Sequence, residues 1–302
     1  MDLRVILLGT SAGVPSKFRG MPALAIFYLD EVLLFDCGEG TQVQLMNANV
    51  SFMRINKIFI THFHGDHIYG LPGLLSTMAF NQREDPIYIY GPRGLDKVLK
   101  AIWGLGYFPR SFPIHYRELD EEEVDFGHYT IASRAVAHTV PGLAYSFSEK
   151  PYRRFDEDRA GALGVPKSKI RKDLTEGKSV IVKGKRITPD MVLGELISGR
   201  KVVYSGDTRP SEAVTELAKN CDLLVHDSTF ASDMREECYQ YGHSTARDAA
   251  VIAKKAGAKK LVLTHISSRY GKAIELETEA KDVFGNAEVG RDFSSYPIKK
   301  AR

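Results

Sequence analysis

Cysteine is scarce in this sequence, and long apolar runs are missing. Cys37, Cys221 and Cys238 show neither zinc-binding spacing nor a disulfide framework, which fits a reducing compartment. No stretch approaches the roughly 20 apolar residues that a membrane span needs. The apolar run within residues 1–10 is too short for a secretory signal and predicts a first strand. We therefore expect a cytoplasmic protein without membrane association.

Linkers, repeats and low-complexity tracts are also missing. With 302 residues and 43% hydrophobic content, the chain can bury one substantial core or two small ones. We expect one domain over residues 1–302 with an inserted segment.

The inserted segment is marked by its charge. Residues 149–186 hold twelve basic and six acidic side chains, a net charge of +6, whereas the whole chain carries +3 and the remainder −3. The segment is interrupted by Gly and Pro and shows little core-forming periodicity. A local basic surface of this kind is typical of polyanion binding. A solvated charged insertion is the alternative.

An array of histidine and aspartate follows the apolar run Ile58-Phe59-Ile60. It reads Thr61-His62-Phe63-His64-Gly65-Asp66-His67. In an extended segment His62 and His64 leave on one side and can meet one ion, whereas the adjacent Asp66 and His67 diverge and suit a second ion better. A mixture of His and Asp without Cys favours zinc or a similar first-row metal, with room for water. The alternative is a solvated loop that is merely rich in histidine.

Three further candidate ligands each follow an apolar or alternating run. These are His138 after residues 130–137, Asp207 after 202–206 and His265 after 261–264. Singly, such a residue is more often structural, but strand ends that converge on one pocket would place all three beside the histidine array. We therefore interpret them as one metal site.

The remaining patterns predict a scaffold of alternating strands and helices. Residues 86–90 alternate like a strand, while residues 95–103 and 245–256 are typical of helices. Residues 68–75 read as a loop that enters a helix. The sequence thus predicts an α/β protein with sheets covered by helices.

Together these residues resemble the metallo-β-lactamase superfamily and, within it, the ribonuclease Z family of endonucleases that mature tRNA 3′ ends. The resemblance rests on the residues above and on four segments: Gly9-Thr10, residues 35–42 with Asp36, residues 242–245 and residues 264–270. It implies an αββα sandwich with metals at one sheet edge. It also implies a single metallo-β-lactamase-type catalytic domain over residues 1–302, with residues 149–186 as a basic arm that serves as a tRNA-binding exosite.

The resemblance implies two zinc ions per subunit. One set of ligands is His62, His64 and His138, and the other is Asp66, His67 and His265, with Asp207 bridging. A hydroxide held between the ions would be the nucleophile in phosphodiester hydrolysis. Asp66 would accept a proton from that water, or act only as a ligand.

The resemblance also implies a catalytic acid, His243, oriented by a carboxylate. That carboxylate falls at Asp227, where the family pattern His-Glu-Ala-Thr has Glu, so the shorter side chain puts its reach in question. The neighbouring His226 is either part of the site or a buried strand residue.

Four residues are candidates for substrate binding. Lys17 and Arg19 lie in a loop similar to the family's PxKxRN loop, with Gly20 where the family has Asn, so no claim about CCA discrimination carries over. Ser267 and Arg269 follow His265 closely and are placed to hold a phosphate. Surface charges and a structural ion pair are the alternatives for the basic residues.

The function implied is removal of the 3′ trailer of precursor tRNA, leaving a 3′-hydroxyl, by a homodimer whose arm recognises folded shape. DNA is not an expected partner. Two alternatives remain open: a small-molecule phosphodiesterase with the same metals, and a non-catalytic RNA-binding protein with structural metals. Thioester or β-lactam hydrolysis does not call for a basic arm.

Overall fold

A computed structural model describes residues 3–106 and 111–300 and separates into two compact units. The larger unit combines the chain up to Ser148 with Arg200–Lys299, and the smaller unit comprises Glu149–Gly199 with Lys300. The smaller unit therefore extends beyond the range 149–186 that charge singles out. With Asp190 and Glu195 included, residues 149–199 carry twelve basic and eight acidic side chains, a net charge of +4.

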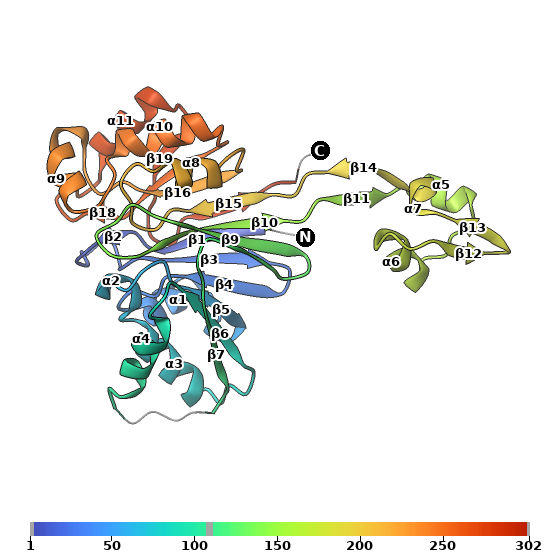
Figure 1. Cartoon of the computed structure of the whole chain (residues 1–302), viewed down its shortest axis with the longest axis horizontal. Helices are drawn as coiled ribbons and strands as arrows, with labels where there is room; N and C mark the ends of the chain where they lie inside the picture. The colour runs from blue at the N-terminus through green and yellow to red at the C-terminus, as the bar shows by residue number, and fades with distance from the viewer. Residues whose placement is uncertain (1–2, 107–110, 301–302) are drawn as a thin grey trace. The chain divides into compact units, whose positions relative to one another are not determined.

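The larger unit is a sandwich of two seven-stranded sheets (Figure 1). The first sheet has the order β20-β1-β3-β4-β5-β6-β7 and is parallel from β4 to β7. Its strands are β1 (Leu3–Gly9), β3 (Ala23–Tyr28), β4 (Glu31–Phe35), β5 (Ile55–Phe59), β6 (Ile87–Gly91), β7 (Ile114–Glu118) and β20 (Ser295–Ile298). Its helices are α1 (Thr41–Asn47), η1 (Phe52–Arg54), α2 (Gly65–Ile68), α3 (Leu71–Phe80) and α4 (Leu95–Trp103). Apolar residues of α1, α3 and α4 share one core cluster with this sheet, so these helices cover its outer face.

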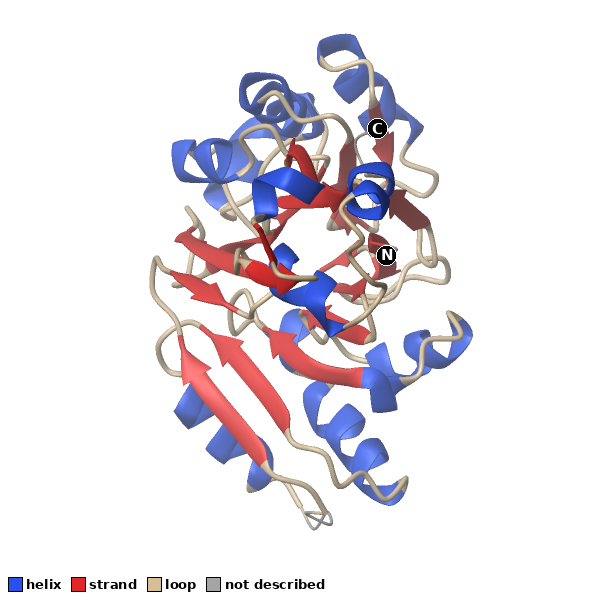
Figure 2. Cartoon of the chain, turned by 90° about the vertical axis from the view of Figure 1, so that its right-hand side faces the viewer, coloured by secondary structure: helices blue, strands red, loops and turns tan. Residues whose placement is uncertain are grey.

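The second sheet has the order β19-β17-β16-β15-β10-β9-β8 and is parallel from β19 to β15. Its strands are β8 (Glu123–Asp125), β9 (Tyr129–Ala135), β10 (Leu143–Glu149), β15 (Lys201–Tyr204), β16 (Leu223–Asp227), β17 (Leu261–Thr264) and β19 (Ala287–Val289). Its helices are α8 (Glu212–Leu217), η2 (Ser232–Met234), α9 (Arg235–Gln240), α10 (Ala246–Ala256) and α11 (Ile274–Val283). A short parallel pair, β2 (Ser11–Ala12) with β18 (Ile266–Ser267), links segments from the two halves. Alanine-rich α10 packs on this sheet with α8 and α11, and Figure 2 shows the layers from another side.

Aromatic side chains fill the space between the sheets. Phe59 stacks on Phe35 and Tyr90, with ring centroids 5.0 and 4.8 Å apart, and lies edge-on to Tyr145 of the second sheet. All four side chains are buried, and offset or edge-on ring pairs add to the stabilisation from burial. The predicted αββα sandwich is confirmed.

Most elements expected from the sequence are present. The helix predicted over residues 95–103 has these bounds, and the helix predicted over 245–256 begins after Thr245, whose side chain caps it in a capping box with Asp248. The predicted strand over 86–90 is β6. The loop expected to enter a helix within residues 68–75 does so at Leu71, where α3 starts; the helical turn α2, which begins at Gly65 before it, was not expected.

The smaller unit has its own hydrophobic core. Its strands are β11 (Tyr152–Phe155), β12 (Val180–Val182), β13 (Lys185–Ile187) and β14 (Leu193–Ile197), and its helices are α5 (Glu157–Ala162), α6 (Lys169–Thr175) and α7 (Pro189–Val192). Each short element contributes one or two apolar side chains, among them Leu174, Val182 and Ile187, to one buried cluster. The sequence shows little core-forming periodicity here because each of these short elements contributes only one or two residues to the core.

Two expectations drawn from absences can be compared with the structure. Cys37, Cys221 and Cys238 are free and buried. Among the described residues, every helix falls short of the length and apolarity needed to cross a bilayer.

Candidate active site

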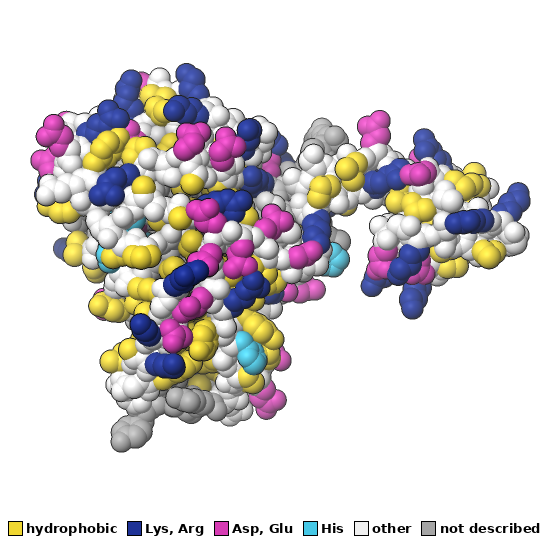
Figure 3. Space-filling view, in the orientation of Figure 1, with side chains coloured by type: hydrophobic (Ala, Val, Ile, Leu, Met, Phe, Trp, Pro, Cys, Tyr) yellow, Lys and Arg dark blue, Asp and Glu magenta, His cyan; other side chains and the backbone are white. Residues whose placement is uncertain are grey.

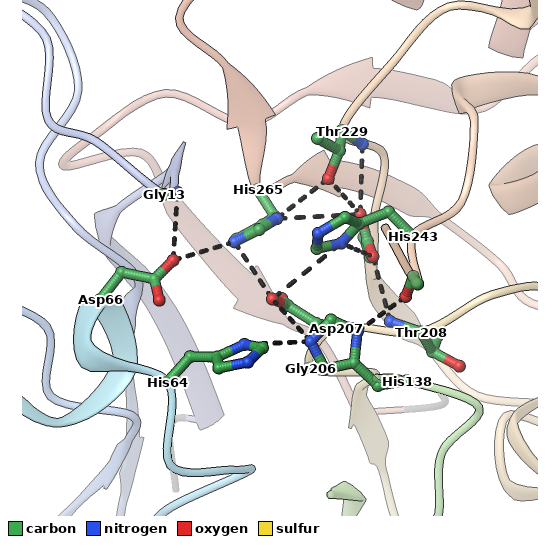
Figure 4. A network of polar contacts seen from close by, with 12 residues as sticks. Gly13, His64, Asp66, His138, Gly206, Asp207, Thr208, Thr229, His243 and His265 are labelled. Carbon is green, nitrogen blue, oxygen red and sulfur yellow. Dashed lines mark hydrogen bonds and ion pairs between the residues drawn. The ribbon is translucent and has the colours of Figure 1, made fainter. Parts of the chain in front are cut away.

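The candidate site lies where several strands of both sheets end. His62 follows β5, Asp207 follows β15, Asp227 ends β16 and His265 follows β17. Of these, Asp207 and His265 line a cavity of about 400 Å³. His62 Nε2 lies 3.6 Å from Asp207 Oδ2, and Asp227 Oδ1 lies 3.9 Å from His265 Nδ1. The lining of the cavity includes Ala12, Gly13, His64, Asp66, Thr139, Asp207, Thr229, Phe230, Gln240, Tyr241, His243, His265 and Ser267. Figure 4 shows Asp66, Asp207, His243 and His265 pointing toward one another from different elements.

One group of potential metal ligands consists of His62, His64, His138 and Asp207. Nε2 of His62 and Nε2 of His138 lie 3.0 and 3.1 Å from Nδ1 of His64. Asp207 Oδ2 is 3.6 Å from His62 Nε2 and 4.0 Å from His138 Nε2. Three ring nitrogens and one carboxylate oxygen thus converge on one point, as the spacing of His62 and His64 predicts.

A second group consists of Asp66, His67, Asp207 and His265. Asp207 Oδ2 is 3.3 Å from Nε2 of both His67 and His265, and Asp66 Oδ2 is 3.4 Å from His265 Nε2. Asp207 therefore belongs to both groups. The expectation that Asp66 and His67 diverge is wrong, because α2 turns both toward the same centre, with Asp66 Oδ2 3.6 Å from His67 Nε2.

The opposite ring nitrogen of most of these histidines is held by the protein. His67 Nδ1 is 2.7 Å from Asp36 Oδ2, and His265 Nδ1 is 2.9 Å from Thr229 Oγ1. His138 Nδ1 is 2.8 Å from the carbonyl oxygen of Gly242. Such contacts fix the ring orientation and the tautomer of a metal-binding histidine. The arrangement leaves the Nε2 atoms directed at the two groups.

Glycine is needed at position 242. Its φ is +86°, and a Cβ added there would lie 2.7 Å from His138 Nδ1. Asp36 and His265 also adopt left-handed backbone conformations, with φ of 55° and 56°. Non-glycine residues in this region are uncommon and gather at functional sites.

Electrostatics suit the site to a cation. Burial lowers the pKa of His62, His64 and His138, which favours the neutral imidazole that binds metals. Burial opposes ionisation of Asp66, but His265 and His67 hold its pKa well below its usual value. For Asp207 too, burial opposes ionisation, but His265, His67 and His62 lower the pKa. His62, His64 and His138 thus favour the neutral form beside ionised carboxylates. For His67 burial lowers the pKa, but Asp207 and Asp36 raise it well above its usual value.

One buried atom points directly to an absent ligand. Within the described part of the chain, buried His67 Nε2 makes no hydrogen bond of good geometry, although it lies 3.3 Å from Asp207 Oδ2 and the other ring nitrogen is paired with Asp36. Burying an unpaired polar atom costs about 1–3 kcal/mol unless something binds it. This atom and the donor sets fit divalent metal ions, with His and Asp as ligands.

Asp227 reaches His243 despite its short side chain. Asp227 Oδ2 lies 2.9 Å from His243 Nδ1, and the carboxylate also accepts hydrogen bonds from the backbone N–H of Thr208 and of Thr229. Burial alone would lower the pKa of His243, but the buried Asp227 carboxylate raises it to about 9. The Asp227 carboxylate therefore favours the protonated form of His243 beside the metal-ligand groups. His226 is fully buried and contacts its own strand through Nδ1, at 2.7 Å from the carbonyl oxygen of Asp227.

The candidate substrate-binding residues are less closely grouped. Ser267 lines the cavity, and exposed Arg269 lies over the ring of Phe230, another lining residue. Lys17 is exposed outside this lining, whereas Arg19 is buried and its Nη1 donates to Thr10 Oγ1 and to the carbonyl oxygen of Gly290, each at 2.7 Å. Arg19 lines a different cavity.

Sequence reasoning missed several residues that shape the site. Asp36 carried part of the family resemblance without an assigned role; it orients His67, and Tyr204 donates from its hydroxyl to the same carboxylate at 2.9 Å. Tyr241, exposed beside Gly242, also lines the cavity. Its position two residues before His243 was the one available signal.

Comparisons with known proteins agree with this geometry. A family model described as "Beta-lactamase superfamily domain" matches residues 173–266, and one described as "Anti-Pycsar protein Apyc1" matches residues 3–104. The chain is 43% identical to "Ribonuclease Z" of Methanosarcina acetivorans, covering 98% of each chain. It is also 43% identical to "Ribonuclease Z" of Archaeoglobus fulgidus, covering 99% of this chain and 98% of the relative.

A solved structure gives the same result. The crystal structure of the short form of human tRNase Z superposes with a TM-score of 0.72 and 28% identity, covering 98% of this chain and 99% of that chain. Identities above 40% over nearly the whole length leave the family in no doubt. The chain therefore belongs to the ribonuclease Z family of metal-dependent endoribonucleases.

Proposed function

We propose that this enzyme removes the 3′ trailer of precursor tRNA by hydrolysing one phosphodiester bond. The tRNA product keeps a 3′-hydroxyl and the trailer carries the phosphate. The observation that carries the proposal is the placement of two metal-ligand groups that share Asp207 next to the Asp227–His243 pair in one cavity. Metal ligands and a proton donor are what displacement at phosphorus needs.

Two zinc ions per subunit are the proposed cofactors. His62, His64 and His138 would hold one ion, Asp66, His67 and His265 the other, with Asp207 between them. When bound, the ions would activate water and neutralise charge on the phosphate. The His and Asp donor set without Cys supports zinc.

His243 is the proposed acid for the leaving 3′ oxygen. When the bond from phosphorus to this oxygen breaks, the oxygen must gain a proton, and the Asp227 carboxylate at 2.9 Å keeps the imidazole both oriented and protonated. Asp66 is the proposed acceptor of the proton from the attacking water. Its Oδ2 is fixed by the backbone N–H of Gly13 at 3.0 Å and lies 3.4 Å from His265 Nε2.

The smaller unit is the proposed tRNA-binding exosite. Its visible surface carries many Lys and Arg side chains with fewer acidic ones (Figure 3). In the hairpin of β12 and β13, Lys183 and Gly184 form the left-handed turn, and Lys183, Lys185 and Arg186 are exposed. Contacts from such residues to phosphates position an RNA without reading its sequence. We further propose a cytoplasmic homodimer, as is common in the family.

Substitutions in this hairpin separate tRNA cleavage from small-ester hydrolysis. Replacing Lys183, Lys185 and Arg186 by Ala should raise KM for precursor tRNA and reduce its dependence on salt, because each lost phosphate contact lowers the salt slope by about 1. Hydrolysis of an aryl phosphodiester should not change. The matched control replaces three exposed lysines of the larger unit, Lys97, Lys254 and Lys255, by Ala.

The outcomes discriminate among the alternatives. Equal losses in the hairpin variant and the control would contradict the exosite. A wild-type enzyme that hydrolyses the aryl ester but never cuts precursor tRNA would support the small-molecule phosphodiesterase. Loss of RNA cleavage with RNA binding preserved in Asp66→Ala would contradict the non-catalytic RNA-binding protein with structural metals.

A further inference from the structure

A second cavity lies beside the loop that carries Lys17 and Arg19. Its volume is about 520 Å³, within the range of sites that take small ligands. Its lining residues are Phe18, Arg19, Gly271, Lys272, Arg291, Asp292 and Phe293. Two exposed aromatic rings and three basic side chains in one concavity are unusual for an ordinary surface, where large exposed aromatics occur singly.

The chemistry of this lining matches a single-stranded nucleotide. Phe18 and Phe293 are 79% and 41% exposed, so each offers a ring face to a ligand. Lys272 and Arg291 are exposed cations within reach of a phosphate. Stacking of bases on aromatic rings combined with backbone contacts from cations is how proteins hold single strands without reading sequence.

The one acidic residue in the lining does not oppose a phosphate. The carboxylate of Asp292 accepts hydrogen bonds from Thr10 Oγ1 at 2.7 Å, from the backbone N–H of Gly20 at 2.6 Å and from Gln44 Nε2 at 2.9 Å. It is thus turned into the protein and fastens the loop that presents Phe18.

Both aromatic residues stand on tied backbone. Ser16 Oγ accepts from the backbone N–H of Phe18 and of Arg19, which closes the loop into a turn. Phe293 has a left-handed φ of 68°, held by its N–H donating to the carbonyl oxygen of Leu7 at 2.7 Å. A bulky residue in this conformation is strained and persists only where the surroundings impose it. The backbone that carries both rings is therefore held in place.

The cavity is linked to the active site through two short segments. Gly13 and Ser267 line the metal-ligand cavity, while Phe18 and Lys272 line this one, five residues further along each segment. Five residues span at most about 18 Å when extended. A nucleic acid strand that leaves the scissile bond can therefore reach the second cavity.

We propose that this cavity binds one nucleotide of the single-stranded 3′ trailer, with its base against Phe18 and Phe293 and its phosphate near Lys272 and Arg291. The assignment rests on the proposed function. Paired nucleotides of the acceptor stem have both base faces covered by their neighbours, so next to the scissile bond it is the single-stranded trailer that offers a free base face.

The test compares precursor tRNAs that carry a single-nucleotide trailer or a longer trailer. Phe18→Ala should raise KM for the longer trailer about 5- to 10-fold, the lower end of the effect of a lost base stack, and leave KM for the single-nucleotide trailer and both kcat values unchanged. Lys272→Ala should act in the same direction. The matched controls are Phe80→Ala, which removes a 73% exposed ring at the end of α3, and Lys97→Ala on α4.

The outcomes separate this inference from the proposed function. A wild-type enzyme that fails to cut either substrate defeats the proposed function. Normal cutting with KM effects that are absent, or equal for both trailers, overturns the trailer site alone. Adenosine monophosphate serves as a probe for a free nucleotide. If it inhibits cleavage of the longer-trailer substrate but not of the single-nucleotide one, the site is supported. If it binds but leaves cleavage of the longer-trailer substrate unchanged, the assignment is overturned.

Discussion

Removal of the His243 imidazole should impair RNA cleavage far more than hydrolysis of an activated ester. His243→Ala removes the proposed proton donor of the leaving 3′ oxygen, the imidazole whose Nδ1 lies 2.9 Å from Asp227 Oδ2. General acid catalysis contributes about 10²- to 10⁴-fold, or roughly 2.7–5.4 kcal/mol, so kcat on precursor tRNA should fall by this factor. An aryl phosphodiester releases a phenolate that is stable without a proton, and its hydrolysis should fall less than about 10-fold.

Asp227→Asn should give a related, smaller defect. Both carboxylate oxygens of Asp227 accept hydrogen bonds, Oδ1 from Thr229 and Oδ2 from Thr208 and His243. In the Asn variant the amide NH₂ would face one of these hydrogen-bond donors and could not accept from it. The variant would also lack the negative charge that favours protonated His243.

The assay measures single-turnover rates for both substrates, with His128→Ala, an exposed histidine of the larger unit, as the matched control. Equal rate losses for RNA and for the aryl ester would refute the role of His243 as proton donor, because the loss would then not depend on the leaving group. Retained RNA cleavage in His243→Ala would refute it as well.

Three further predictions concern metal binding and stability. Gly242→Ala should lower the amount of bound metal and kcat together, because the added Cβ would lie 2.7 Å from His138 Nδ1. The control is Gly271→Ala, where an added Cβ meets nothing within 4 Å. Equal metal content in the two variants would contradict the prediction. Phe59→Ala should lower the free energy of unfolding by about 3–5 kcal/mol in denaturant titration, because Phe59 is fully buried between Phe35 and Tyr90; a loss below about 1 kcal/mol would be inconsistent with that packing. Burial alone would raise the pKa of Glu31, but Lys57 and Tyr129 lower it below its unfolded value near 4.5. The ionised Glu31 therefore stabilises the fold above pH 4.5, and this stabilisation is lost as the pH falls through the lower folded pKa. The Tm of the wild type should therefore exceed that of Glu31→Gln by no more than about 2–4 °C near neutral pH, and the gap should close in acid; a constant gap would argue against the ion pair.

Local patterns allowed the candidate metal ligands to be predicted as one cluster. His62 and His64 lie close in sequence, and His138, Asp207 and His265 each follow a strand, so the sandwich brings them to one edge. The pairing of Asp36 with His67, by contrast, joins residues in different elements, and only the packed structure shows which nitrogen Asp36 orients. Second contacts of this kind are a product of tertiary packing, which spacing does not encode.

Backbone direction explains the errors. The expected divergence of Asp66 and His67 assumed an extended chain, whereas Gly65 starts a helical turn that brings both to one centre. The shorter side chain of Asp227 left its reach to His243 open, and its position at the end of β16 puts Oδ2 within hydrogen-bonding distance of His243. The core of the smaller unit escaped notice because it is assembled from elements of three to seven residues.

The most direct test of the account is cleavage of an end-labelled precursor tRNA, before and after treatment with chelator and again after zinc is restored. Mapping of the product ends should give a single metal-dependent cut beside the discriminator nucleotide, with a 3′-hydroxyl on the tRNA. A cut that survives chelation, or no cut while an aryl phosphodiester is still hydrolysed, would contradict a metal-dependent tRNA 3′ endonuclease.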